Sequence, residues 1–248
     1  MIFKQFYHLG RYIIWLAKAF TRPEKHIIYY RETLRQIEEM GIGSLKIVLL
    51  ISLFIGAVTA VQLSYQFGDG LIPTYYIGYA LRDMVIIELA PTITSLVLAG
   101  KIGSSIAAEI GGMRQKEIID AMEIMGVNTE GFIVLPKILA GLFSAPLLIA
   151  LAAALSMASG FFAGTAFGNI TPGDFIKGLS SFYDSYTVFI MIVKSFFFGF
   201  IIVTVSAYHG YFVKGGSREL GKAGTDAIVY SNILILVFDY LIAQLMMG

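Results

Sequence analysis

The sequence contains no cysteine, and its 248 residues include only three histidines. Without cysteine the chain can form no disulfide, offers no thiolate to a metal and has no cysteine nucleophile. The histidines are at positions 8, 26 and 209, and none has a second ligand three or four residues away in the pattern of a metal site. We therefore expect no metal site on this chain.

Charge is also scarce, since charged residues make up 14% of the chain and hydrophobic residues 57%. The mean hydropathy is +0.76, which is typical of a membrane protein. Eighteen basic residues against seventeen acidic ones give a net charge of +1, so no overall field favours nucleic acid as a partner. The composition excludes an ordinary soluble domain.

Long apolar runs predict an all-α polytopic membrane protein with about five transmembrane helices. A helix of about 20 residues crosses the hydrocarbon layer. We predict a single membrane domain over residues 45–248, with spans at about 45–67, 84–110, 132–168, 186–213 and 227–247. The third run is too long for one level span and too short for two with a turn, so we interpret it as one span that is extended or kinked at Pro136 or Pro146.

The segments outside these spans predict shorter helices. Residues 1–44 are expected to form cytoplasmic or interfacial amphipathic helices, the first lying in the headgroup layer, with a soluble surface helix as the alternative. We expect Gly41 and Gly43 to end the second one. Residues 169–185 predict another interfacial helix, capped by Thr171 and begun by Pro172. Residues 214–226 predict a flexible basic link.

Small residues recur along two spans, at Ser52, Gly56, Ala60 and Ser64, and again at Gly103, Ala107 and Gly111. Such rows allow two helix backbones to approach closely, and we expect them to pack inside a bundle.

The distribution of basic residues predicts the orientation. Most lie before the first span, near the 101–137 connection and at 214–226, whereas the opposite side has only Arg82 and Lys177. By the positive-inside rule the N-terminus is cytoplasmic and the C-terminus lies outside.

Residues 112–126 predict a charged helix between two apolar segments, with the sequence GMRQKEIIDAMEIMG. Ile118, Met122 and Met125 form an apolar edge, the charged side chains face away, and Gly126 can supply a left-handed end. This pattern favours docking on another protein. A helix that rests on lipid without a partner is the alternative.

The sequence around this helix resembles the signature region of the MlaE/YrbE permeases, over ELAPTITSLVLAGKIGSSIAAEIGGMRQKEIIDAMEIMGVNTEGFIVLPK. These are the membrane subunits of ABC transporters that work with MCE-domain proteins in phospholipid and related lipid traffic. The family usually has Gly where this chain has Ala90, Arg where it has Lys101 and Lys137, and a proline near Thr129. These differences weaken the assignment of roles to individual residues more than they weaken the resemblance to the family.

The resemblance implies that the charged helix is a coupling helix, which docks in a cleft of a separate cytoplasmic ATPase. That ATPase would carry ATP and Mg²⁺, so we expect no cofactor and no catalytic residue on this chain. The coupling residues would be Glu109, Met113, Arg114, Lys116, Glu117, Asp120, Met122 and Glu123. It further implies a homodimer in the cell inner membrane, a periplasmic C-terminus, a periplasmic or membrane-anchored MCE-domain partner and a phospholipid substrate.

Three charges lie within predicted spans, at Glu88, Lys194 and Asp239. A charge in the membrane is costly unless it meets a partner or water, so a functional role is the default hypothesis. We predict that the three line the polar part of a lipid-binding cavity, with Lys194 as the cation for a phosphate. A structural ion pair of Lys194 with Asp239 is an equal alternative, and both roles can hold.

Two other functions compete with transport by an ABC permease. A stand-alone secondary transporter or channel usually has an internal repeat, and we find no pair of similar halves. A membrane-embedded lipid enzyme could use Ser206 and His209, although no acidic residue that would orient the histidine is evident. The stretch GSRELGKA at 216–223 nearly matches a phosphate-binding loop, but Ala223 replaces the hydroxyl that would hold Mg²⁺, so we expect no nucleotide site there.

Overall fold

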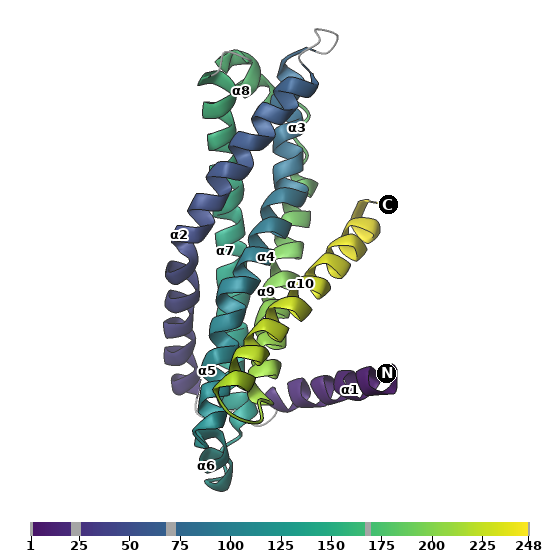
Figure 1. Ribbon diagram of the computed structural model, residues 1–248. Helices are drawn as coiled ribbons and strands as arrows, with labels where there is room; N and C mark the ends of the chain where they lie inside the picture. The colour runs from purple at the N-terminus through teal and green to yellow at the C-terminus, as the bar shows by residue number, and fades with distance from the viewer. Residues whose placement is uncertain (1, 21–25, 68–72, 167–169, 248) are drawn as a thin grey trace. The chain divides into compact units, whose positions relative to one another are not determined.

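The computed structural model describes residues 2–20, 26–67, 73–166 and 170–247, which form helices and no strand (Figure 1). The elements are α1 (Ile2–Ala19), α2 (His26–Gln66), α3 (Tyr75–Met84), η1 (Val85–Ile93), α4 (Thr94–Leu98), η2 (Ala99–Gly103), α5 (Ser104–Gln115), α6 (Ile118–Ile124), α7 (Thr129–Ala166), α8 (Pro172–Ser180), α9 (Ser185–Tyr211) and α10 (Ser217–Met247).

Within the described residues, five helical runs are long and apolar enough to cross a membrane. They are Tyr29–Gln66, Tyr75–Gln115, Thr129–Ala166, Ser185–Tyr211 and Ser217–Met246. The predicted all-α membrane architecture with five spans is confirmed. The third apolar run is one continuous helix, α7, and the predicted last residues of that span, 167 and 168, lie outside the described residues.

Contacts divide the chain into two compact units. Unit 1 comprises residues 1–43, 98–144 and 198–235, and unit 2 comprises residues 44–97, 145–197 and 236–248.

Two interruptions of helical structure that the sequence predicts, at Gly41 and Gly43 and at 214–226, are absent or shorter than predicted. Gly41 and Gly43 do not end a helix, because α2 runs from His26 to Gln66. A helical glycine costs about 1 kcal/mol relative to alanine, and the buried residues Gln36 and Met40 hold this stretch in place. The predicted flexible link at 214–226 is also wrong over most of its length, since α10 begins at Ser217.

The second span is continuous but contains two π-helical segments, η1 and η2. Pro91 lies within η1. A proline has no N–H and its ring clashes with the preceding turn of an α-helix, so the wider π turn accommodates it.

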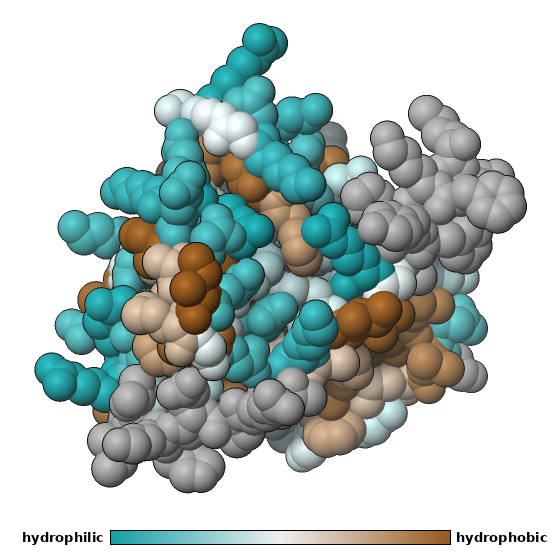
Figure 2. Space-filling view, turned by 90° about the horizontal axis from the view of Figure 1, so that it is seen from below, coloured by the Kyte–Doolittle hydropathy of each residue, from teal (hydrophilic) through white to brown (hydrophobic). Residues whose placement is uncertain are grey.

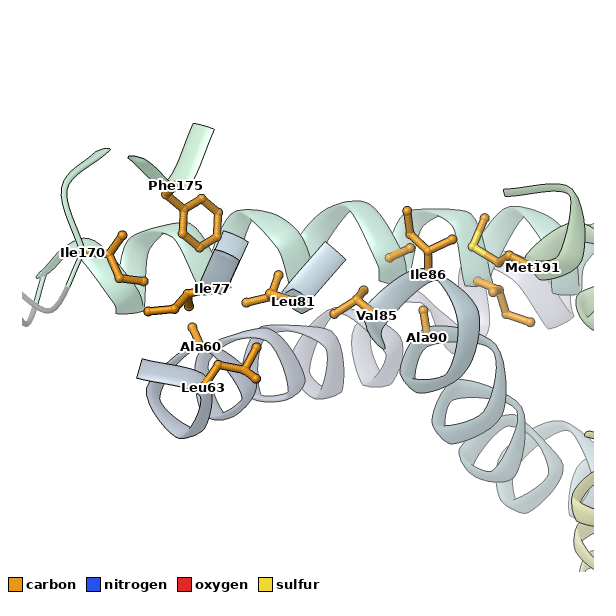
Figure 3. Packing of buried hydrophobic residues seen from close by; sticks show 12 residues of the cluster. Ala60, Leu63, Ile77, Leu81, Val85, Ile86, Ala90, Ile170, Phe175 and Met191 are labelled. Atoms are coloured by element: carbon orange, nitrogen blue, oxygen red, sulfur yellow. The ribbon is translucent and has the colours of Figure 1, made fainter. Parts of the chain in front are cut away.

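Unit 2 has a hydrophobic core formed by residues of α2, α3, η1, α7, α8 and α9, together with Ile170 just before α8. Figure 3 shows ten of the twelve residues with labels; the whole cluster is Ala60, Leu63, Ile77, Leu81, Val85, Ile86, Ala90, Ile149, Ala153, Ile170, Phe175 and Met191. Helix α8 begins as the sequence predicts, because the backbone N–H of Asp174 donates to Oγ1 of Thr171 at 3.2 Å. Phe175 of α8 is fully buried, whereas its neighbour Ile176 is exposed.

Close backbone contacts in unit 2 confirm the first row of small residues. A Cβ on Gly56 would lie 1.7 Å from the carbonyl oxygen of Ser156, so α2 and α7 touch where only glycine fits. Ser156 Oγ donates to the carbonyl of Ser52 at 3.0 Å. Helices α3 and α8 also touch at a position where only glycine fits, because a Cβ on Gly178 would lie 2.1 Å from the carbonyl oxygen of Tyr75.

In unit 1, α9 packs against the second row of small residues and against α1. A Cβ on Gly210 would lie 2.8 Å from the carbonyl oxygen of Ala107. The indole of Trp15 in α1 is buried, 5.7 Å from the ring of Tyr208. Other apolar residues of α1, Ile13 and Ile14, remain exposed, as an interfacial helix requires.

Candidate functional site

The three charges predicted within spans meet in unit 2. Glu88 lies on η1, Lys194 on α9 and Asp239 on α10. The Lys194 Nζ is 2.6 Å from Oδ1 of Asp239 and 2.8 Å from Oε2 of Glu88. The ion pair of Lys194 with Asp239 is therefore present, and Glu88 joins it to form a three-residue cluster, which we call the charge cluster.

Lys194 has a third contact, with the backbone of η1. Its side chain is fully buried, and Nζ donates to the carbonyl oxygen of Ile87 at 3.1 Å. Ile87 lies four residues before Pro91, and proline has no N–H with which to give this carbonyl its α-helical hydrogen bond. The contacts with Ile87 and Glu88 are hydrogen bonds, whereas the contact with Asp239 is an ion pair without hydrogen-bond geometry.

The two carboxylates of the charge cluster differ in exposure. The side chain of Asp239 is 9% exposed, and its Oδ2 accepts a hydrogen bond from Oγ1 of Thr92 at 3.1 Å. The side chain of Glu88 is 50% exposed. Glu88 is therefore the member that can meet a ligand directly, and Lys194 can bind a phosphate only if Glu88 gives up its contact.

The segment 112–126 is not one helix, contrary to the prediction. Helix α5 ends at Gln115, Glu117 has the left-handed φ of 59°, and α6 covers only Ile118–Ile124. A left-handed residue breaks the helical hydrogen-bond ladder, so the chain turns a corner here. Gly126 has a φ of +80° and ends α6 as predicted.

Three of the predicted coupling residues hold this corner together. Nη1 of Arg114 lies 2.8 Å from Oδ1 of Asp120 and 3.6 Å from Oε1 of Glu123. The hydroxyl of Tyr211 on α9 donates to the same Glu123 oxygen at 2.9 Å. Ile119 beneath them is fully buried. These contacts fix α6 against α5 and α9.

The remaining side chains of the corner form an exposed surface, which we call the corner surface. It consists of Lys116, Glu117, Ile118, Ile124 and Met125, with Met122 half-buried beside them. Viewed from the end of Figure 1 at which α6 lies, the protein surface is mainly hydrophilic with separate hydrophobic patches (Figure 2). Ile124 is 87% exposed, and the sequence prediction omitted it because it falls outside the helical stripe of Ile118, Met122 and Met125.

Glu109 and Met113, also predicted as coupling residues, line a pocket formed with α2 and α7 instead. Oε2 of Glu109 is 2.6 Å from Nζ of Lys137, and this ammonium also donates to Oε1 of Gln36 at 3.0 Å. Lys137 is 3% exposed. The network ties three helices of unit 1 together.

The geometry does not support the enzyme alternative. Ser206 is fully buried, and a Cβ on Gly103 would lie 2.7 Å from its Oγ. This Oγ has no hydrogen-bond partner among the described residues. The ring of His209 stacks on Tyr230 with 5.1 Å between centroids. Ser206 and His209 thus form no catalytic pair.

The loop-like stretch at 216–223 is helical from Ser217 onward. The backbone N–H of Gly216 donates to Oε2 of Glu219 at 3.1 Å, so this amide is already used as a helix cap. A phosphate-binding loop wraps several free backbone amides around the phosphate, and here the chain is already helical over most of the stretch.

Comparison with known proteins identifies a family. Residues 33–245 match the model of the family described as Permease MlaE. A probable ABC transporter permease protein of Rickettsia bellii is 31% identical, over 96% of this chain and 91% of that protein. The intermembrane phospholipid transport system permease protein MlaE of Haemophilus influenzae is 28% identical, over 97% and 92%. The chloroplastic protein TRIGALACTOSYLDIACYLGLYCEROL 1 of Arabidopsis thaliana is 30% identical, over 92% of this chain and 65% of its own length.

Proposed function

The chain belongs to the MlaE permease family, and we propose that it moves phospholipid or a related lipid between the inner membrane and an MCE-domain partner. Its membership and its five apolar helical runs make it a membrane-embedded ABC transporter permease. The name of the Haemophilus influenzae relative supports a phospholipid as the substrate. ATP hydrolysis would take place on a separate cytoplasmic ATPase.

The corner surface is the proposed docking site for that ATPase. What supports this is its construction: exposed Ile124 and Met125 project from a short helix that Arg114 and buried Ile119 fix to α5. A partner that pushes on α6 would therefore move α5 rather than bend the loop. Hydrophobic side chains among charged ones are typical of protein–protein contacts.

Co-purification tests the docking site. The chain is expressed with its cognate ABC ATPase, and Ile124→Ser with Met125→Ser is expected to reduce the ATPase recovered at least tenfold. The matched control is Ile13→Ser with Ile14→Ser on α1, two residues of comparable type and exposure. Full recovery of the ATPase with the α6 variant, or equal loss with both variants, would reject α6 as the docking element.

The charge cluster is the proposed polar part of the lipid site. Support comes from the half-exposed Glu88, whose position is fixed by the buried pair of Lys194 and Asp239. An ammonium or hydroxyl group of a lipid headgroup could bind Glu88 as it stands. A phosphate could bind Lys194 by replacing Glu88.

Glu88→Gln tests this role because the amide keeps the size of the carboxylate and removes its charge. We expect less phospholipid to co-purify with the variant while the ATPase remains bound. Lys177→Gln on α8, which changes a charge away from the cluster, is the control. Unchanged lipid content with Glu88→Gln would show that the cluster is structural only.

The predicted orientation and the homodimer stay proposals. The absence of cysteine allows a direct test of orientation, since Lys116→Cys and Ile176→Cys each introduce one exposed thiol. A membrane-impermeant maleimide applied from outside should label position 176 and not 116. For the dimer, the most apolar part of α10 is only 22% buried, which leaves surface for a second copy. The mass of the purified protein tests this.

A further inference from the structure

Two adjoining hollows in unit 1 lie along the first turns of α2. The charged hollow has a volume of about 850 Å³ and is lined by residues of α2, α5 and α7. The apolar groove has a volume of about 430 Å³ and is lined by residues of α2 and α7 alone. Tyr29 and Leu34 line both. Each volume lies within the range of sites that hold small molecules.

The charged hollow is electrically balanced. Its lining includes three basic residues and three acidic ones. The basic residues are Arg31, Arg35 and Lys137, and the acidic residues are Glu32, Glu38 and Glu109. Four of these form two ion pairs, because Arg35 lies 2.7 Å from Glu32 and Lys137 lies 2.6 Å from Glu109.

Arg31 and Glu38 remain, and neither has an ion-pair partner among the described residues. They are seven residues apart on α2, which places them on the same face of the helix, about 10 Å apart along its axis. Both are exposed. The charged hollow thus offers one unpaired cation and one unpaired anion.

The apolar groove is lined by Tyr29, Tyr30, Thr33, Leu34, Ile37, Leu139 and Phe143. Tyr30 and Phe143 are 70% and 66% exposed. Only hydroxyl groups interrupt this lining, and the one on Thr33 is covered by protein atoms. A hydrocarbon chain is therefore the ligand that the groove suits.

We infer that the two hollows together bind one zwitterionic glycerophospholipid, with its phosphate at Arg31, its ammonium at Glu38 and an acyl chain in the apolar groove. Guanidinium groups bind phosphate with strong, charge-assisted hydrogen bonds, and carboxylates do the same for ammonium. A lipid with a net negative charge would bring its phosphate to Arg31 but leave Glu38 without a cation. The balanced charge therefore selects a zwitterion.

The sequence of α2 places this site at headgroup depth. Five charged residues lie within 31–39, and an uncharged apolar stretch begins at Ile47. The site shares no residue with the charge cluster, so the inference does not depend on the proposed transport function. It adds a second lipid site in the other compact unit.

Native mass spectrometry of the purified chain tests the inference, with phosphatidylethanolamine and phosphatidylglycerol of identical acyl chains as probes. We expect the wild type to bind phosphatidylethanolamine more tightly. Arg31→Gln with Glu38→Gln should weaken this binding about tenfold, which corresponds to about 1.4 kcal/mol. Arg218→Gln with Glu39→Gln, which changes two exposed charges outside the hollow, should leave it unchanged.

Two further variants separate recognition from folding. R31E with E38R exchanges the two charges and should retain most of the binding, because the hollow stays balanced. Leu34→Trp should block binding, since Leu34 lines both hollows. A thermal unfolding curve for each variant shows whether it is folded.

A photoreactive phosphatidylethanolamine locates the site directly. Cross-links at residues 29–37 or 139–143 support the inference, and they should persist in the Glu88→Gln variant. Cross-links confined to unit 2, equal binding of the two lipids by the wild type, or full binding by a folded Arg31→Gln and Glu38→Gln variant would each overturn it. None of these results would bear on the proposed docking of the ATPase.

Discussion

Replacing Lys194 by methionine should strongly destabilise the protein. The change removes a fully buried cation that contacts Asp239 at 2.6 Å and Glu88 at 2.8 Å. Asp239 would remain nearly buried, with the hydroxyl of Thr92 as a hydrogen-bond donor and the carboxyl group of Glu88 beside it. Breaking a buried ion pair by removing one member costs about 3–5 kcal/mol, because the other charge is left uncompensated. For a chain of this size that corresponds to a loss of roughly 10 °C in Tm.

The double variant Lys194→Met with Asp239→Leu should recover most of this loss. Replacement of both members of a buried pair by apolar residues is often neutral or stabilising by about 1–4 kcal/mol. Thr92 then loses an acceptor, which costs about 1 kcal/mol. Glu88 stays half-exposed, and its charge can be solvated in part. The double variant is therefore expected to unfold within a few degrees of the wild type.

Thermal unfolding in detergent measures both variants, and the phospholipid content of the same samples separates structure from function. The proposed lipid site requires the double variant to be stable and yet poor in bound phospholipid. A stable double variant with a normal lipid content would refute the functional part of the reasoning. A single variant that unfolds at the wild-type temperature would refute the structural part.

Three further predictions concern other parts of the molecule. Gly56→Ala should destabilise the protein by about 1–3 kcal/mol in thermal unfolding, because its Cβ would lie 1.7 Å from a carbonyl oxygen of α7, whereas Gly100→Ala, with no atom within 4 Å, should not. Glu117→Gly should stabilise the protein by up to about 1 kcal/mol, because the φ of 59° at Glu117 is strained for a residue with a Cβ. An unchanged Tm would show that no strain is stored there. The hydrogen bond from Thr74 lowers the pKa of Asp174, so the contact between them should persist as pH falls and weaken only below the ordinary carboxyl range. Thr74→Val should raise that pKa in an NMR titration, and an unchanged titration curve would contradict the assignment.

Local features were predictable where local chemistry decides them. Thr171 followed by Pro172 predicts a helix start, and the hydrogen bond of the cap is present. Gly126 predicts a left-handed end to α6, and its φ is +80°. Gly41 and Gly43 misled the prediction because glycine only weakens a helix, and the buried neighbours Gln36 and Met40 outweigh that cost. Propensity is a weak guide where packing decides.

The candidate functional site likewise combines features that local chemistry predicts with features that packing decides. The high cost of charge in a membrane was enough to identify Glu88, Lys194 and Asp239 as special, but not to show that Lys194 meets both carboxylates. The corner at Glu117 was missed because a glutamate rarely takes a left-handed conformation. The resemblance implies that Glu109 is a coupling residue, but it does not show that Glu109 pairs with Lys137 from another helix.

Composition and short-range order are sufficient to predict five apolar helical runs, rows of small residues that pack, and three charges that cannot stay isolated in lipid. Which groups meet depends on how the helices pack. Lys194 on one helix meets Glu88 and the carbonyl of Ile87 on a second, and Asp239 approaches from a third. Such contacts depend on the rotation and offset of each helix, which packing fixes and which no local pattern records.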